Sequence, residues 1–413
     1  MTCLAATPVL RRDIQLLRTS RSVYVSTGRT VIFTLVLLSC NLLSAQSNQR
    51  ATSSDQEVPG NACAEADQAL AASRWQAAID DYSGCLKISP DSFAVLSNMG
   101  IAYSHLGRMP DAINSYTKAL ELDPSNTKIE FNLAITEIKS GDYASAVDRL
   151  RHLQRSESDL RYDELLAFCY YHLESYSLAA RSAEKVYQTH PDDAGNALIL
   201  GSAYTRMGQY EKAVPLITLA LKAAGSAEGH LILAQTLLGM HQYGPAEEEL
   251  NQAVSIQPNL PGAHTARGDV DLGFDRIQAA EAEYALAIQD DPNDFEANYL
   301  LGRLKRFDKD ILAAKKYLDA ADQLRPRSPE VMYERAEIAL SEQRFADAVP
   351  LLEGVIKAQP DNAQAYLMLA ESYQRTGRRE EAQKEGELYN AKRRELHEKK
   401  AQLQQGSVDK MER

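Results

Sequence analysis

Prolines recur along this chain at a nearly constant interval. Most gaps between successive members are 34 residues, and two gaps of 67 each fit two repeats, one of them a residue short. A period of this length predicts an array of small supersecondary units that bury their apolar faces on one another. The recurring members are Pro90, Pro124, Pro191, Pro258, Pro292, Pro326 and Pro360.

The segments between these prolines share one interior pattern. The clearest copy has Leu96, Met99, Gly100, Tyr103, Gly107, Ala112, Tyr116, Ala119 and Pro124, and a second has Leu200, Gly201, Tyr204, Gly208, Tyr210, Ala213 and Ala220. Bulky-x2-Leu-Gly-x2-Tyr, a later Ala-x3-Phe and a terminal Pro are the marks of the tetratricopeptide repeat, which the chain resembles. The resemblance implies an all-α, right-handed superhelical solenoid of helix-turn-helix units. It also implies that the first helix of each repeat, helix A, lines the concave wall.

About ten repeats fit between residue 59 and residue 404. Repeats four, seven and eight lack the glycine that usually joins helix A to helix B and carry Glu174, Asp275 and Lys309 there. We expect the inter-helix turns of these repeats to differ from the rest. The predicted starts are Pro59, Phe93, Thr127, Leu160, Ala194, Ala227, Pro261, Phe295, Pro329 and Ala363.

The first 45 residues have the order of an export signal. Five arginines precede the apolar run Val31–Leu38, and small residues follow it. This order is typical of a secretory signal, and the apolar run is shorter than the ~20 residues that span a bilayer. Cleavage after Ala45 is the first interpretation, lipidation of Cys40 in a lipobox-like Leu-Leu-Ser-Cys is the second, and an uncleaved membrane anchor is the third. The predicted location is the periplasm or an outer-membrane surface, and residues 46–58 read as a flexible polar linker.

The charged C-terminal segment is expected to cap the array. After Gly377 the residues are mostly Arg, Lys and Glu, which predicts a polar helix ending near Gln404 and a disordered tail over 405–413. Capping of the last apolar face is the favoured role. A coiled-coil role lacks a sustained apolar heptad.

Composition and motifs argue against catalysis and against nucleic acid. The net charge of −12 repels phosphates, and no phosphate loop, His-Glu-x-x-His, nucleophile elbow or Cys-x-x-Cys is present in the sequence. We therefore expect no enzyme activity, no cofactor, no metal site and no nucleic-acid partner. Membrane contact is expected only through an N-terminal lipid or anchor.

Two cysteines of the first repeat, Cys63 in helix A and Cys85 in helix B, lie toward the same end of the predicted hairpin. A disulfide is possible if their Cα atoms come within about 7 Å, and an oxidising compartment favours it. The alternative is two small buried side chains. Cys169 reads as a lone core thiol.

Partner-binding residues are predicted on the A helices of repeats two to four. Phe131, Ile135, Phe168 and Tyr171, with Ile138, form an apolar cluster rimmed by Lys128 and Arg161. Asn98 and Asn132 occupy the sixth position of successive A helices, where peptide-clamping tetratricopeptide domains use asparagine. Packing of adjacent A helices is the alternative role for these side chains. The corresponding positions in repeats two and five predict a partly small and polar surface of Ser97, Ser104, Ser202 and Thr205, which Leu198 and Ile199 interrupt. A weaker second patch pairs Tyr299 and Arg303 with Tyr333 and Glu337.

The resulting hypothesis is a non-catalytic interaction scaffold of the cell envelope that binds proteins or extended peptides. The alternative is an accessory subunit of a secretion, pilus or polysaccharide-processing machine that holds one dedicated partner. Several modest patches would favour the scaffold, and one deep patch would favour the dedicated binder.

Overall fold

The computed structural model describes residues 62–411, and every regular element in this range is an α-helix. The expected leader and linker, residues 1–58, lie outside the described residues. The helices are α3 (Ala62–Ala71), α4 (Trp75–Ile88), α5 (Phe93–His105), α6 (Met109–Leu122), α7 (Thr127–Ser140), α8 (Tyr143–Ser156), α9 (Leu160–His172), α10 (Tyr176–Thr189), α11 (Ala194–Arg206), α12 (Tyr210–Ala223), α13 (Ala227–Gly239), α14 (Tyr243–Ile256), α15 (Ala263–Gly273), α16 (Ile277–Asp290), α17 (Phe295–Phe307), α18 (Ile311–Leu324), α19 (Pro329–Ser341), α20 (Phe345–Ala358), α21 (Ala363–Arg375) and α22 (Arg379–Met411).

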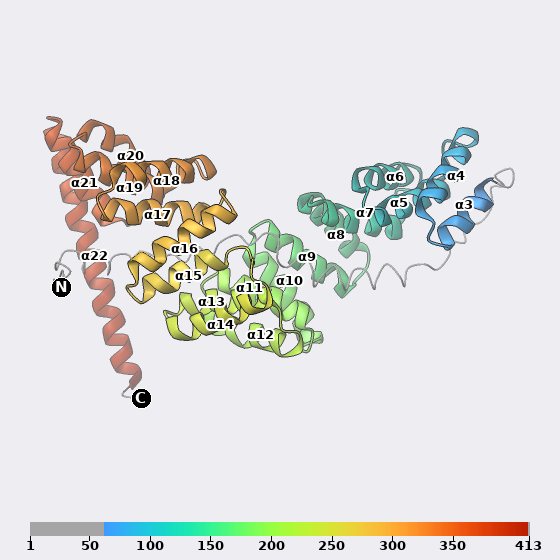
Figure 1. Cartoon of the computed structure of the whole chain (residues 1–413), viewed down its shortest axis with the longest axis horizontal. Coiled ribbons are helices and arrows are strands. Elements are labelled where there is room, and N and C mark those ends of the chain that lie inside the picture. The colour runs from blue at the N-terminus through green and yellow to red at the C-terminus, as the bar shows by residue number, and fades with distance from the viewer. Residues whose placement is uncertain (1–61, 412–413) are drawn as a thin grey trace. The chain divides into compact units, whose positions relative to one another are not determined.

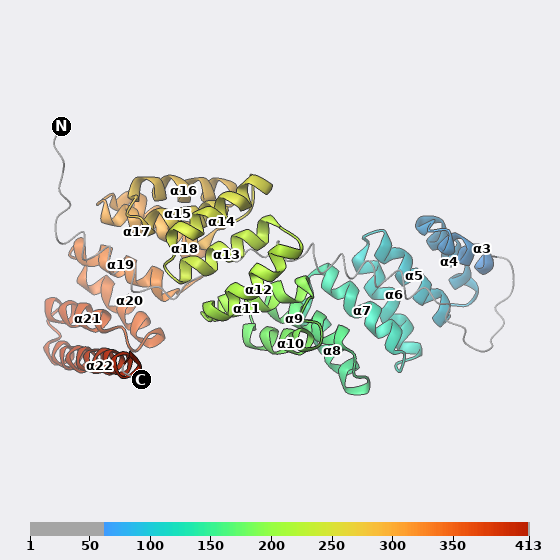
Figure 2. The same cartoon turned by 90° about the horizontal axis from the view of Figure 1, so that it is seen from below.

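Successive helices pair into hairpins, which confirms the predicted all-α repeat fold (Figures 1 and 2). Odd-numbered labels are A helices and even-numbered labels are B helices. The A helices begin at the predicted residues except α3 and α15, which begin at Ala62 and Ala263. The hairpins form two compact units, with repeats one to six in residues 62–258 and repeats seven to ten in residues 259–411.

Short polar side chains start most A helices. Ser92 accepts a hydrogen bond from the backbone N–H of Val95, Asn126 from Ile129 and Asp294 from Ala297. Each of these bonds satisfies one of the amide donors that a helix leaves open at its N-terminus. The chain therefore fixes where each A helix begins, directly after the loop in which the recurring proline lies.

Helices A and B cross closely at a small residue, as the pattern predicts. A Cβ on Gly100 of α5 would lie 2.5 Å from the Tyr116 ring of α6, and a Cβ on Gly268 of α15 would lie 2.5 Å from the Tyr284 ring of α16. Tyr116 and Tyr284 are almost completely buried. A small residue on one helix thus makes room for a tyrosine on the other, and this pair holds the hairpin together.

Neighbouring hairpins are joined by a ring contact that the sequence pattern did not reveal. The first residue of a B helix stacks on the end of the next A helix: Trp75 lies on His105 with ring centroids 4.1 Å apart, and Tyr143 lies on His172 at 4.6 Å. Tyr176 accepts a hydrogen bond of 2.9 Å from Arg206 in the same way. These contacts link each repeat to the following one near the A–B turn.

The turns that lack glycine do not differ from the others, so that expectation was wrong. Glu174, Asp275 and Lys309 adopt φ values of 58°, 60° and 63°, close to the 73° of Gly107 in the standard turn. The crossing of the two helices sets the geometry of the turn. The residue at this position must therefore adopt a positive φ, whatever its side chain. Side chains other than glycine pay a steric cost of ~1–2 kcal/mol in this left-handed region.

We predict that Lys309→Gly stabilises the unit of residues 259–411. Lys309 is exposed and holds φ at 63°, so glycine relieves backbone strain there without opening a cavity. The expected gain is about 0.5–1 kcal/mol, because the greater entropy of glycine in the unfolded chain offsets part of the relief. Urea denaturation followed by circular dichroism measures it.

The reverse substitution at a matched turn, Gly377→Ala with φ at 84°, should lose stability. A destabilised Lys309→Gly protein would contradict the account of the turn.

The last helix covers the last hairpin and runs on. Ala382 of α22 packs against the buried cluster that contains Met368 and Leu369, and Lys392 forms an ion pair of 2.9 Å with Asp361. Helix α22 continues past Gln404 to Met411, so the predicted helix end and tail boundary were wrong, and Figure 1 shows α22 extending beyond α21. No helix in the described part of the chain is long and apolar enough to cross a membrane.

Candidate partner-binding faces

Cys63 and Cys85 are joined by a disulfide in the structure, with their Cα atoms 5.9 Å apart. The bond ties α3 to α4, because the two helices run antiparallel and both cysteines lie toward the same end. Cys85 of α4 is buried, whereas Cys63 of α3 is half-buried. Cys169 of α9 is a buried free thiol.

Phe131 and Ile135 lie one turn apart on α7 and are half-buried. The Phe131 ring meets Tyr162 of α9 edge-on, with centroids 5.5 Å apart, and the Arg161 guanidinium lies 5.4 Å from the Phe131 ring centre. Part of Phe131 therefore packs the A helices of repeats three and four together. The remaining surface of both side chains is available to a ligand, beside the exposed Lys128.

Phe168 does not belong to that surface, which corrects the prediction. Its side chain is completely buried, with the Tyr143 ring 6.0 Å away and the His172 ring 4.5 Å away. Ile138 is buried as well. Helix position gives the direction of a side chain but not the depth to which its neighbours cover it.

Tyr171 keeps part of its surface exposed at the end of α9. Its ring meets the ring of Tyr176 edge-on, with centroids 5.6 Å apart. Burial raises the pKa of Tyr171 to about 12, against an opposing effect of Arg206. The phenol is therefore neutral at physiological pH.

The A helices of repeats five and six are closed to ligands. Leu198, Ile199, Ser202 and Thr205 are all buried, although their helix positions predicted a partly polar surface. Thr205 makes a hydrogen bond of 2.7 Å with Thr236 of α13, which shows that α11 and α13 touch directly. Ser97 of repeat two is also buried, so these five positions were wrong as surface residues.

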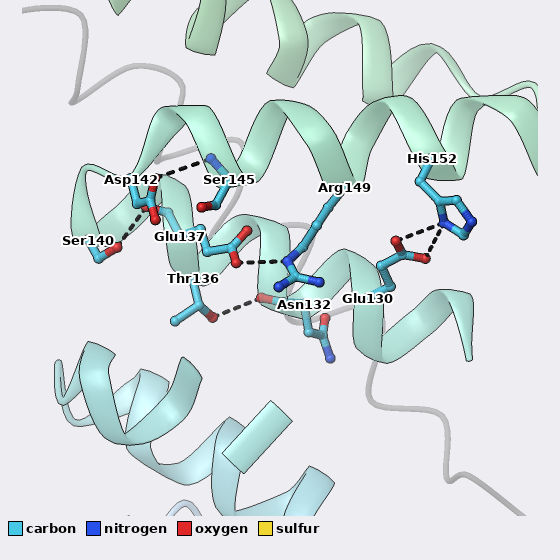
Figure 3. A network of polar contacts seen from close by, with 9 residues as sticks. All are labelled: Glu130, Asn132, Thr136, Glu137, Ser140, Asp142, Ser145, Arg149 and His152. Atoms are coloured by element: carbon cyan, nitrogen blue, oxygen red, sulfur yellow. Dashed lines mark hydrogen bonds and ion pairs between the residues drawn. The ribbon is translucent and has the colours of Figure 1, made fainter. Parts of the chain in front are cut away.

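The two asparagines predicted to bind a peptide differ in their surroundings. Asn98 donates through Nδ2 to Tyr82 Oη at 2.9 Å and to Asp67 Oδ1 at 3.3 Å, while Tyr82 donates to the same carboxylate at 2.5 Å. Asn132 makes no side-chain hydrogen bond within the described residues, and Figure 3 shows its amide projecting from α7 on the side away from α8.

Two ion pairs behind Asn132 hold α7 and α8 together (Figure 3). His152 lies 2.9 Å from Glu130, and Arg149 donates to Glu137 at 2.7 Å. Burial raises the pKa of Glu137, against the effect of Arg149. Sequence reasoning missed both pairs, because a glutamate at these helix positions has no partner until the hairpin closes.

The weaker patch predicted in the second unit is a network of ion pairs and hydrogen bonds that involves α17 and α19. Arg303 Nε lies 3.2 Å from Glu334 Oε1, and Arg306 Nε lies 2.5 Å from Glu334 Oε2. Tyr299 accepts a hydrogen bond of 3.5 Å from Arg303. Sequence reasoning missed Glu334, the buried centre of the network, although it stands at the sixth position of helix A as the asparagines do.

A buried carboxyl lies beside this network. Glu296 forms an ion pair of 3.1 Å with Arg325, yet burial raises the pKa of Glu296 to about 8, with Asp269 and Asp294 adding to the effect. The folded chain therefore binds this proton more tightly than the unfolded chain does. The contribution of Glu296 to stability is fully present below about pH 4.5 and is lost as the pH rises toward 8.

We predict that Glu296→Gln flattens this pH dependence. Glutamine keeps the shape and cannot ionise, so the variant should gain on the order of 1–3 kcal/mol relative to the parent between pH 5.5 and pH 8.5. Urea denaturation at the two pH values measures the gain. Glu380→Gln on the exposed surface of α22 makes the same charge change and should show none; an equal gain in both variants would rule out burial as the cause.

The described residues contain no group of three or more His, Cys, Asp or Glu side chains able to hold a metal ion. His230 and His264, in equivalent positions of repeats six and seven, instead pair with Glu249 and Glu283 at 2.6 Å. These histidines tie helix A to helix B in their own hairpins.

Comparison with known proteins identifies the repeat. Models described as tetratricopeptide repeat match residues 93–126, 131–194, 198–231 and 339–403. The chain contains tetratricopeptide repeats.

Relatives of these tetratricopeptide repeats include the peroxisomal targeting signal receptor of Candida glabrata, 31% identical over 17% of this chain and 12% of that protein. Anaphase-promoting complex subunit 3 of Schizosaccharomyces pombe is 21% identical over 64% of this chain and 40% of that protein. The chain spans about a tenth of the length of the first curated relatives it matches.

Solved structures share the repeat at low identity. A tetratricopeptide repeat protein of Parabacteroides merdae is 16% identical, covers 59% of this chain and 97% of its own, and has a TM-score of 0.47. YrrB, described as a TPR protein with an unusual peptide-binding site, is 19% identical over 45% of this chain and 97% of its own, with a TM-score of 0.39.

Proposed function

We propose that this chain is a non-catalytic scaffold that binds other proteins, and that it takes an extended peptide on the A helices of repeats two to four. The observation that carries the proposal is on α7, where Phe131, Asn132 and Ile135 keep part of their surface. Apolar side chains on a rigid base, rimmed by a charge such as Lys128, suit a peptide.

Asn98 and Asn132 would form different hydrogen bonds with the backbone of that peptide. Asp67 can only accept hydrogen bonds when ionised, so it fixes Asn98 with Nδ2 inward and Oδ1 outward. Asn98 therefore offers an acceptor to a peptide N–H. Asn132 is not fixed by a partner within the described residues and can offer either group.

The scaffold is favoured over an accessory subunit with one dedicated partner. The A helices of repeats five and six are closed by contacts such as that between Thr205 and Thr236. Accessible side chains occur in repeats two to four of the first unit and in repeats eight to ten of the second unit. Two modest faces fit a protein that gathers more than one partner.

Export to the cell envelope is the second part of the proposal. The basic residues up to Arg29 followed by Val31–Leu38 support removal of the leader after Ala45 or lipidation of Cys40. The Cys63–Cys85 disulfide is consistent with an oxidising compartment, where such bonds persist.

We predict that Phe131→Ser with Ile135→Ser weakens partner binding and leaves the fold intact. Both side chains are only half-buried, so helicity should be retained, while binding should weaken at least tenfold because apolar contact area is lost. A photo-crosslinking residue at position 135 in intact cells, followed by mass spectrometry, first identifies the partner. The affinity of the purified proteins is then measured.

The matched crosslinking control is position 312, since Leu312 is 84% exposed on α18. The same adducts from positions 135 and 312, or an unchanged affinity of the double variant, would refute the proposed peptide site. Phe168→Ser serves as a core control and should unfold repeat four.

We predict that the mature protein begins at Gln46 or at a lipidated Cys40 and contains one disulfide. Intact mass and thiol alkylation of unreduced, denatured protein test both points. One free thiol, Cys169, is expected with cleavage after Ala45. A mature chain that retains Arg11 and Arg12 would overturn export, and three free thiols would overturn the disulfide.

A further inference from the structure

Three A helices of the second unit carry a large side chain at the same position. Tyr299, Tyr333 and Leu367 are each 34 residues apart, on α17, α19 and α21. The two tyrosines are half-buried and Leu367 is 39% exposed. We name these three residues the tyrosine–leucine row. No helix within residues 259–411 covers it completely.

The positive charges near the row are already neutralised. Arg303 and Arg306 both contact the buried Glu334, and Arg306 also lies 3.9 Å from Glu337. Two guanidinium groups thus face two carboxylates, and neither arginine leaves an excess positive charge for an anionic ligand.

The carboxylates that remain give the row a net negative charge. Glu330 of α19 is half-buried and accepts hydrogen bonds only from neutral groups, Ser328 at 2.6 Å and Gln359 at 3.5 Å. Glu371 of α21 is exposed and makes no ion pair within the described residues. Burial raises the pKa of Tyr333, and the neighbouring Glu337 and Glu334 raise it further, which is consistent with a negative potential at the row.

We propose that the tyrosine–leucine row with Glu330 and Glu371 is a second docking surface, for an extended segment in which lysine or arginine alternates with apolar residues. This goes beyond the proposed function, which places a peptide on the other unit. Charge complementarity selects the occupant: carboxylates attract its cations, which can also stack on the Tyr333 ring. Leu367 and the tyrosine rings contact its apolar side chains.

The contrast with the first unit supports this choice of occupant. There, the apolar residues Phe131 and Ile135 are accompanied by the positively charged Lys128 and Lys139 on the same helix. A basic segment that suits repeats eight to ten is repelled from those lysines. The two faces should therefore select different partners.

Fluorescence anisotropy of a labelled peptide, four copies of Lys-Pro-Leu, tests the proposal on the full chain. Proline keeps this peptide extended. We expect binding that weakens with added salt, and at least a tenfold loss with Leu367→Ser or with Glu330→Gln plus Glu371→Gln. The counterpart with glutamate in place of lysine should not bind.

Matched variants separate this surface from general attraction to an acidic protein. Glu380→Gln plus Glu398→Gln removes the same charge from exposed positions of α22 and should leave binding unchanged. An equal loss in this pair, an unchanged affinity of Leu367→Ser, or equal binding of the glutamate peptide would overturn the proposal. Phe131→Ser with Ile135→Ser should not weaken binding, so this result is independent of the peptide site in the first unit.

Discussion

The close crossing of helices A and B at a small residue is the constraint on which the other contacts depend. Gly100 leaves room for the Tyr116 ring, and Gly268 does the same for Tyr284. Once the two helices are this close, the turn between them must reverse the chain in a single left-handed residue. That requirement is strong enough to hold Glu174, Asp275 and Lys309 in a backbone conformation that glycine would adopt at lower cost.

The fold could be predicted from sequence because the close crossing of helices A and B recurs in each of the repeats. A proline after helix B and a small residue in helix A each carry local information, and their spacing fixes the hairpin. The C-terminal end lacks this redundancy. The repeat pattern ends within α22, and the end of this helix was placed too early, since a charged helix gives no apolar period to mark where it stops.

The candidate sites were predictable only in part, because the sequence pattern does not show how deeply each side chain is buried. Phe131 and Phe168 both stand at ligand-facing positions of their A helices, but only Phe131 keeps exposed surface. The difference comes from Tyr143 of α8 and from His172, one turn further along α9 itself, whose rings both lie against Phe168. Such cover depends in part on the size of a residue on the neighbouring helix α8, and the pattern of α9 alone does not contain that information.

Glu334 shows how the same helix position can serve binding or stability. It stands where Asn98 and Asn132 stand, yet it is buried and holds two arginines of the preceding A helix. A buried carboxylate between two guanidinium groups is costly to desolvate, and it is retained only if its hydrogen bonds are satisfied. By fixing both arginines against α19, Glu334 removes their charge from the surface and leaves Glu330 and Glu371 to set its sign. The identity of one buried residue therefore decides which class of partner the surrounding face can attract.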